Sequence, residues 1–174
     1  SGERAIVEII SKNSKVVRAD AIEILESSSH RVAPPCEYAV QGRCGGCDFQ
    51  HIDIGYQVQL KREVVREQFL KLAGIDLPQE FEVKGVDPSD GLRWRTRMDF
   101  AVSHNGRLGL FGQRSNEVVE IKDCLIADAK MNVGEIAQKK WNGKERIEIA
   151  VSSFGEINLT RAGRSISGPT QLKE

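Results

Sequence analysis

The sequence predicts an α+β fold in which a partial small β-barrel precedes a central antiparallel sheet domain with two helices and a cysteine-bearing loop. Three observations predict it. Alternating apolar residues occur early in the chain and again after residue 93, one long segment has helical periodicity, and three of the four cysteines crowd into a segment with neither pattern. With 174 residues, 40% of them hydrophobic, the chain can form one good core or two small ones.

The first 33 residues resemble part of a barrel. Residues 4–10 are β-rich, residues 11–14 form a polar turn, and residues 15–25 alternate partly between apolar and polar side chains. Because two or three strands without a helix cannot close a core, we interpret residues 1–33 as the later half of a small β-barrel.

Charge and hydropathy exclude several classes of protein. The 25 Lys and Arg residues balance the 25 Asp and Glu residues, which argues against bulk electrostatic binding of nucleic acid or anionic membrane. A polyanion site must therefore be a local cluster. The sequence contains neither an apolar run of membrane-spanning length nor a secretory signal, so we expect a cytoplasmic protein with no membrane partner.

Four cysteines form the clearest chemical signal, with the pattern C-x7-C-x2-C followed by one distant residue: Cys36, Cys44, Cys47 and Cys124. Residues 31–48 have no strand or helix periodicity, so we expect a ligand-bearing loop. Pro34 and Pro35 stiffen its start, and the paired Gly45 and Gly46 permit a tight turn with positive φ.

The cysteine spacing leaves three interpretations open. Disulfides are disfavoured in a cytoplasmic chain that can form an apolar core. A four-thiolate zinc site usually has two C-x2-4-C pairs, and here there is one. Three close cysteines and one remote cysteine are typical of several iron–sulfur proteins. Since zinc and iron–sulfur clusters both accept four thiolates, ligand type alone does not separate them.

The remaining elements follow in order along the chain. Residues 54–74 have the strongest helical pattern, with an apolar stripe that needs a partner and a stop at Gly74. Asn105-Gly106 predicts a tight hairpin between residues 95–103 and 107–112. We further expect a strand at residues 117–121, a second helix at 127–141, a second hairpin from residues 146–151 and 156–160, and a polar tail from residue 164 to residue 174.

Arginines recur at every second position before the first hairpin, at Arg93, Arg95 and Arg97. In a strand they would share one face, about 7 Å apart, while Trp94, Thr96, Met98 and Phe100 would build the core on the other. This face could be an ordinary solvent-exposed surface on which the arginines pair with carboxylates such as Asp99. Guanidinium groups also bind phosphates and stack on unpaired bases, which favours a nucleic-acid surface. Arg114 would extend this candidate RNA-binding surface.

Several segments together resemble the bacterial RNA uracil-5-methyltransferases, most closely the type that modifies 23S ribosomal RNA. The resemblance covers most of residues 1–130. It rests on Pro34-Pro35-Cys36, Gly42 to His51, Gln57 to Lys61, Arg93 to Arg97, Leu108 to Gly112 and Val118 to Ala127.

This resemblance implies a cofactor and a domain order. It implies that all four cysteines hold a 4Fe-4S cluster, although the loop between Cys36 and Cys44 is longer than is usual in the family. Residues 1–33 would be the second half of an OB-like, RNA-binding TRAM domain, residues 34–165 the central α/β domain, and residues 166–174 a linker or tail.

The family also implies a reaction. In it a cysteine attacks C6 of a uracil, a methyl group passes from S-adenosylmethionine to C5, and a base removes the proton. The S-adenosylmethionine site and these catalytic groups belong to a C-terminal domain that we expect outside this chain, so this chain alone would be inactive. Its expected partner is RNA, with no DNA partner. A ferredoxin-like electron carrier and a zinc-stabilised binding module are the alternatives.

Overall fold

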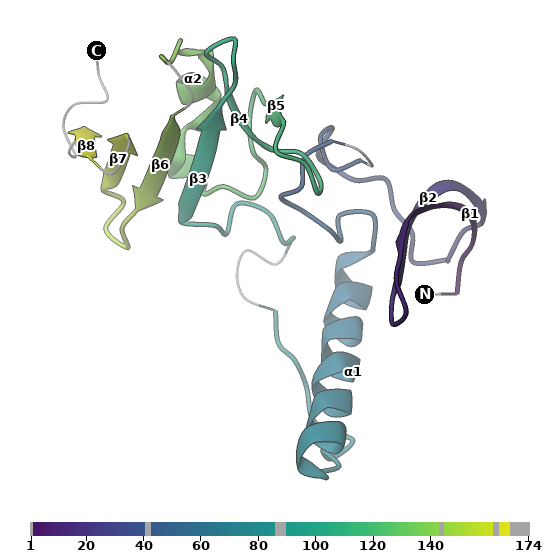
Figure 1. Cartoon of the computed structure of the whole chain (residues 1–174). Coiled ribbons are helices and arrows are strands. Elements are labelled where there is room, and N and C mark those ends of the chain that lie inside the picture. The colour runs from purple at the N-terminus through teal and green to yellow at the C-terminus, as the bar shows by residue number, and fades with distance from the viewer. Residues whose placement is uncertain (1, 41–42, 86–89, 143–144, 162–163, 168–174) are drawn as a thin grey trace.

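The computed structural model describes residues 2–40, 43–85, 90–142, 145–161 and 164–167. It is an α+β fold with two antiparallel sheets, as the sequence predicts. Figure 1 shows the larger sheet at one end of the molecule and the long helix α1 (Ile54–Ala73), which projects away from it. No helix in the described part of the chain is long and apolar enough to cross a membrane.

The N-terminal segment is a two-stranded hairpin of β1 (Arg4–Lys12) and β2 (Val17–Glu26). Large apolar side chains on both strands are exposed, Ile9 by 61% and Ile22 by 57%. Within the described residues the hairpin belongs to no closed barrel, so the two predicted strands are confirmed and the barrel remains a prediction.

Helix α1 (Ile54–Ala73) begins and ends close to where the sequence predicts. The Asp53 carboxylate accepts a hydrogen bond from the Tyr56 amide at the first turn, and Gly74 adopts the left-handed conformation that ends the helix. No residue of α1 is buried, and although Tyr56 at its first turn stacks on His30, Leu72 near its end is 82% exposed.

The six-stranded sheet has the order β5-β4-β3-β6-β7-β8. Its first half is the predicted Asn-Gly hairpin of β3 (Arg97–Val102) and β4 (Leu108–Phe111), extended by β5 (Val118–Glu120). Its second half is the predicted hairpin of β6 (Arg146–Val151) and β7 (Ile157–Arg161). The pairing of β3 with β6 joins the halves, so sequence-distant hairpins share one sheet.

A single apolar core lies on one face of this sheet. The short helices η1 (Ala129–Met131) and α2 (Val133–Gln138) cover that face. Its fully buried side chains include Phe100, Leu108, Met131, Ile136, Ile147 and Ile149. The three cysteines of the loop pack against the same core.

Four predictions about local structure are wrong. The helix expected over residues 127–141 is interrupted by Asn132, whose φ of 48° lies in the left-handed region. Strand β3 begins at Arg97 rather than at residue 95, and Trp94 is 48% exposed rather than part of the core. Thr96, also expected in the core, is exposed.

The tail expected from residue 164 is in part a strand. β8 (Arg164–Ser167) pairs with β7 and forms the edge of the sheet. The rest of the expected tail, residues 168–174, lies outside the described residues.

Candidate metal centre

All four cysteines line one cavity of about 100 Å³. Cys36, Cys44 and Cys47 come from the loop between the hairpin and α1, and Cys124 follows β5. All four are free thiols; Cys124 is buried and the other three are half-buried. The structure therefore brings together the residues that the sequence singles out, and it does not pair them as disulfides.

The loop is held in place by backbone contacts with the sheet domain. Cys44 forms a bridge with Gly112 at the end of β4, and the Gly45 amide donates to the Phe111 carbonyl at 3.0 Å. A Cβ on Gly45 would lie 3.1 Å from Gln113 Cα. Gly45 is thus needed for close approach, whereas the expected positive φ at Gly45 and Gly46 is wrong.

Burial raises the pKa of the thiols at Cys44, Cys47 and Cys124, and the neighbouring cysteines raise it further. Such thiols stay protonated in water, but a bound metal would remove their protons. Among the described residues, no three His, Cys, Asp or Glu side chains converge closely enough to hold one metal ion.

Two residues that sequence reasoning missed support this loop. Tyr38 is buried, its carbonyl accepts from the Cys44 amide at 3.1 Å, and its hydroxyl accepts from the Lys122 amide at 3.1 Å. The Gln50 side chain accepts from the Cys36 amide at 3.2 Å. An aromatic residue between the first two cysteines of the loop is the signal that could have identified Tyr38.

Arg93 contacts the segment that carries Cys124. Its φ of 56° places it outside the strand that the sequence predicts. Its guanidinium donates to the Asp123 carboxylate at 2.7 Å and to the Cys124 carbonyl at 3.1 Å. Burial is the largest single influence on Asp123 and would raise its pKa, but the hydrogen bond from Arg93, the hydrogen bond from the Cys124 amide and the charge of Arg93 together lower that pKa. Arg93 therefore fixes the segment that carries Cys124.

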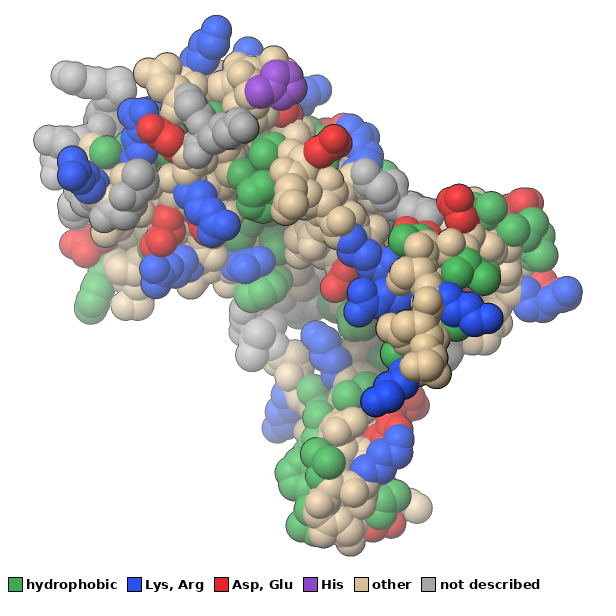
Figure 2. All heavy atoms as spheres, in the orientation of Figure 1, with side chains coloured by type: hydrophobic (Ala, Val, Ile, Leu, Met, Phe, Trp, Pro, Cys, Tyr) green, Lys and Arg blue, Asp and Glu red, His purple; other side chains and the backbone are tan. Residues whose placement is uncertain are grey.

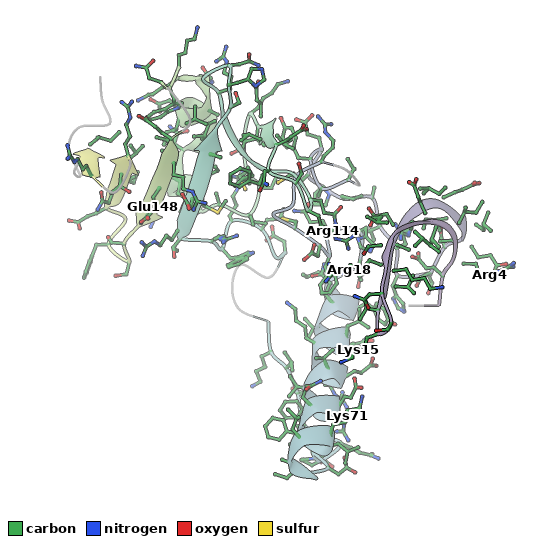
Figure 3. The ribbon with its side chains drawn as sticks, viewed as in Figure 1. Arg4, Lys15, Arg18, Lys71, Arg114 and Glu148 are labelled. Carbon is green, nitrogen blue, oxygen red and sulfur yellow. The ribbon has the colours of Figure 1, made fainter. Side chains whose placement is uncertain are left out.

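The other predicted RNA-binding arginines differ in their partners. Arg97 pairs with Glu148 at 2.7 Å, and Arg114 pairs with Asp20 on β2 at 3.0 Å. Figure 3 shows Arg114 near Arg18 above the start of α1, far from Glu148 on the sheet. The four arginines therefore do not form one continuous stripe.

Arg95 alone of these four has no carboxylate partner among the described residues. It lines the cysteine cavity, and its charge lowers the pKa of Cys47 against the larger effect of burial. Its amide donates to the Ile126 carbonyl at 2.8 Å, and its carbonyl accepts from the Asp128 amide at 2.9 Å. Its backbone is thus tied to the segment that follows Cys124.

Fold and site together define an α+β domain with a four-cysteine cavity and an adjacent exposed arginine. Comparison with known proteins gives its relatives. The chain is 40% identical over 165 residues to an uncharacterized RNA methyltransferase of Streptomyces avermitilis, a match that covers 88% of this chain and 38% of that protein. No family model matches the chain.

Other relatives have more specific names. The chain is 38% identical over 127 residues to the 23S rRNA (uracil(1939)-C(5))-methyltransferase RlmD of Halomonas elongata, a match over 72% of this chain and 26% of that protein. It is 35% identical over 128 residues to RlmD of Pseudomonas aeruginosa, over 72% of this chain and 28% of that protein. The chain is therefore homologous to part of the bacterial RNA methyltransferases, as its motifs indicate, and spans less than two-fifths of the length of these relatives.

Proposed function

We propose that this chain is the RNA-recognition part of an S-adenosylmethionine-dependent RNA uracil-5-methyltransferase that acts on 23S rRNA, and that its four cysteines hold a 4Fe-4S cluster. The observation that carries the proposal is the shared cavity of the four cysteines beside Arg95. The names of the relatives support the reaction class and the RNA substrate.

The cavity suits a cluster better than a single zinc ion. Zinc draws four thiolate sulfurs to within about 2.3 Å of one point. Here four cysteines surround a space of about 100 Å³, which is more room than a single ion needs. A cluster supplies a rigid inorganic link between Cys36, Cys44, Cys47 and Cys124 when bound.

The chain's own residues would then position RNA. Tyr38 and Gln50 hold the cysteine loop, and Arg93 holds the segment around Cys124. Arg95 presents an unpaired guanidinium between them, suited to a phosphate or to the face of an unpaired base. Because a uracil inside folded RNA must leave its stack to react, gripping the surrounding strand is a distinct task. We place methyl transfer in the remainder of a longer protein that resembles the relatives.

Anaerobic purification followed by absorption spectroscopy and by iron and sulfide analysis tests the metal. We expect a brown protein with iron and sulfide in the ratio of a 4Fe-4S cluster. A colourless protein with stoichiometric zinc would contradict the cluster assignment.

RNA binding is tested by comparing Arg95→Ala with Arg97→Ala in a salt titration against a uridine-containing single-stranded RNA. Arg95 has no carboxylate partner among the described residues, whereas Arg97 has one. We therefore expect Arg95→Ala to weaken RNA binding by about 3- to 10-fold and to reduce the slope of log K against log salt concentration by about 0.7. Arg97→Ala should have the smaller effect. If both variants keep the RNA affinity and the salt dependence of the wild type, neither arginine belongs to the RNA-binding surface.

A further inference from the structure

A second cleft, of about 640 Å³, lies between the cysteine loop, the β3–β4 turn and helix α2. We call it the Tyr38 cleft, after the buried tyrosine in its wall. Three cations line it from three separate segments: Arg43 from the loop, Arg107 from the turn and Lys122 from the residues after β5. Its volume lies within the range of about 300–1,000 Å³ typical of ligand pockets.

These three cations form no ion pair within the described part of the chain, in contrast to eight other arginines that each pair with a carboxylate. The Arg43 guanidinium lies 5.4 Å from the centre of the Tyr38 ring. Arg107 donates to the Gln138 carbonyl at 3.2 Å. Both guanidinium groups are therefore held in place by neutral partners and keep donors for a ligand.

Two carboxylates also line the cleft, and one of them is already engaged. Glu120 accepts from the Ser103 hydroxyl at 2.7 Å and from the Asn105 side-chain amide at 3.0 Å. These hydrogen bonds lower its pKa, and Arg107 lowers it further from a distance. With Glu37 as the second carboxylate, the cations outnumber the carboxylates, so the cleft favours an anion.

Arg43 connects the cleft to the turn that follows β4. The Gln113 amide donates to the Arg43 carbonyl at 2.8 Å, so Arg43 lies beside the turn that carries Arg114. Arg114 itself pairs with Asp20, so the cations of the cleft are Arg43, Arg107 and Lys122. Because they come from three separate segments, they can contact successive phosphates of one strand.

We propose that the Tyr38 cleft binds backbone phosphate of the substrate RNA, as a second contact separate from Arg95. This inference rests on the proposed RNA-binding function. Arg43 and Arg107 would bind phosphate oxygens through their guanidinium donors, and Lys122 would add a point charge. The contact reads no base, so it would hold the strand without contributing to the choice of the modified uracil.

The test uses Arg107→Gln and Lys122→Gln in the metal-loaded protein, because neither residue lines the cysteine cavity. Arg146→Gln is the matched control, since Arg146 is exposed and its guanidinium pairs with Asp99 at 2.8 Å. Affinity for a uridine-containing single-stranded RNA is measured over a range of salt. We expect each cleft variant to weaken RNA binding by about 3- to 10-fold and to reduce the slope of log K against log salt concentration by about 0.7. The control variant should change neither quantity.

Competition with uridine monophosphate and inorganic phosphate identifies the source of the phosphate. We expect both compounds to displace little RNA when their phosphate concentration equals the RNA phosphate concentration that saturates the protein. If either competes as well as RNA, the cleft is a small-anion site and the inference is overturned. If the wild type binds RNA and the cleft variants bind it as tightly as the control variant does, the inference alone is overturned. If the wild type does not bind RNA, the proposed function is overturned as well.

Discussion

Glu3 and Arg31 form a two-pronged ion pair between the start of β1 and the chain that follows β2. The Arg31 guanidinium donates to the two Glu3 oxygens at 2.6 and 2.7 Å, and the Ser28 amide donates to the same carboxylate at 3.1 Å. The hydrogen bond from Arg31 is the main reason why the pKa of Glu3 falls from 4.5 to about 2. The pair ties both ends of the hairpin together.

This shift predicts a pH dependence of stability. The folded-state pKa of Glu3 lies below its unfolded value, so the stabilisation is complete above about pH 4.5 and is lost as the pH falls toward about 2. Because the pair is partly solvent-exposed, we expect it to contribute about 1 kcal/mol. Chemical denaturation of Glu3→Gln at several pH values should show a smaller loss in this window than the wild type. Glu8→Gln, on the same strand, is the control, and equal pH profiles in all three proteins would contradict the prediction.

For single residues, the sequence identifies candidate metal ligands better than it identifies the contacts that each arginine makes. The four cysteines are found from residue type and spacing, and the structure places them around one cavity. The roles of the arginines could not be separated in this way. Arg93, Arg95 and Arg97 look equivalent in the sequence, but positive φ at Arg93 and a carboxylate partner at Arg97 give them different tasks. Those differences arise from long-range contacts that alternation does not encode.

Among the elements, α1 was predictable because its signals are local. Its cap at Asp53, its stop at Gly74 and its apolar periodicity all lie within the segment itself. The helix expected over residues 127–141 failed because its apolar residues are buried by two short helices that turn at Asn132. Apolar periodicity cannot distinguish one helix from two when the core covers both.

The exposed face of α1 leads to a second prediction. Figure 2 shows apolar side chains along the projecting end of this helix, and Leu72 is 82% exposed. We expect this face to dock on the remainder of a longer protein, because the relatives extend well beyond the matched segment. In this chain alone, Leu72→Ala should change the free energy of unfolding by less than about 0.5 kcal/mol.

The matched control is Leu108→Ala, since Leu108 is fully buried and its truncation should cost about 2–5 kcal/mol. Chemical denaturation measures both variants. Binding of a hydrophobic dye should fall in Leu72→Ala but not in Leu108→Ala. A cost above about 2 kcal/mol at Leu72 would show that the face is already covered in this chain.

For the molecule as a whole, the cysteine cavity is where sequence-distant segments meet. Cys44 reaches the cavity from the loop before α1, where it pairs with Gly112 at the end of β4. Cys124 reaches it from the segment after β5, and Arg95 from the segment before β3. The apolar core of the six-stranded sheet, built from β3, β6 and the short helices, also includes Tyr38 and Cys124 on the side of the cysteine cavity. No residue of β6 or β7 lines that cavity. A bound metal centre would therefore stabilise the cavity side of the domain most and β6 and β7 least.

This division predicts what metal removal does. After chelation, hydrogen exchange should speed up at residues 36–47 and 121–128 and around Arg95, because their mutual positions depend on the link between the loop and Cys124. Residues of β6 and β7 should keep their protection, since none of them lines the cysteine cavity. Cys124→Ala, which removes one thiol without a chelator, should give the same pattern. Faster exchange spread evenly through β6 and β7 would mean that the metal centre holds the entire sheet together, and no change at residues 121–128 would mean that Cys124 is not a ligand.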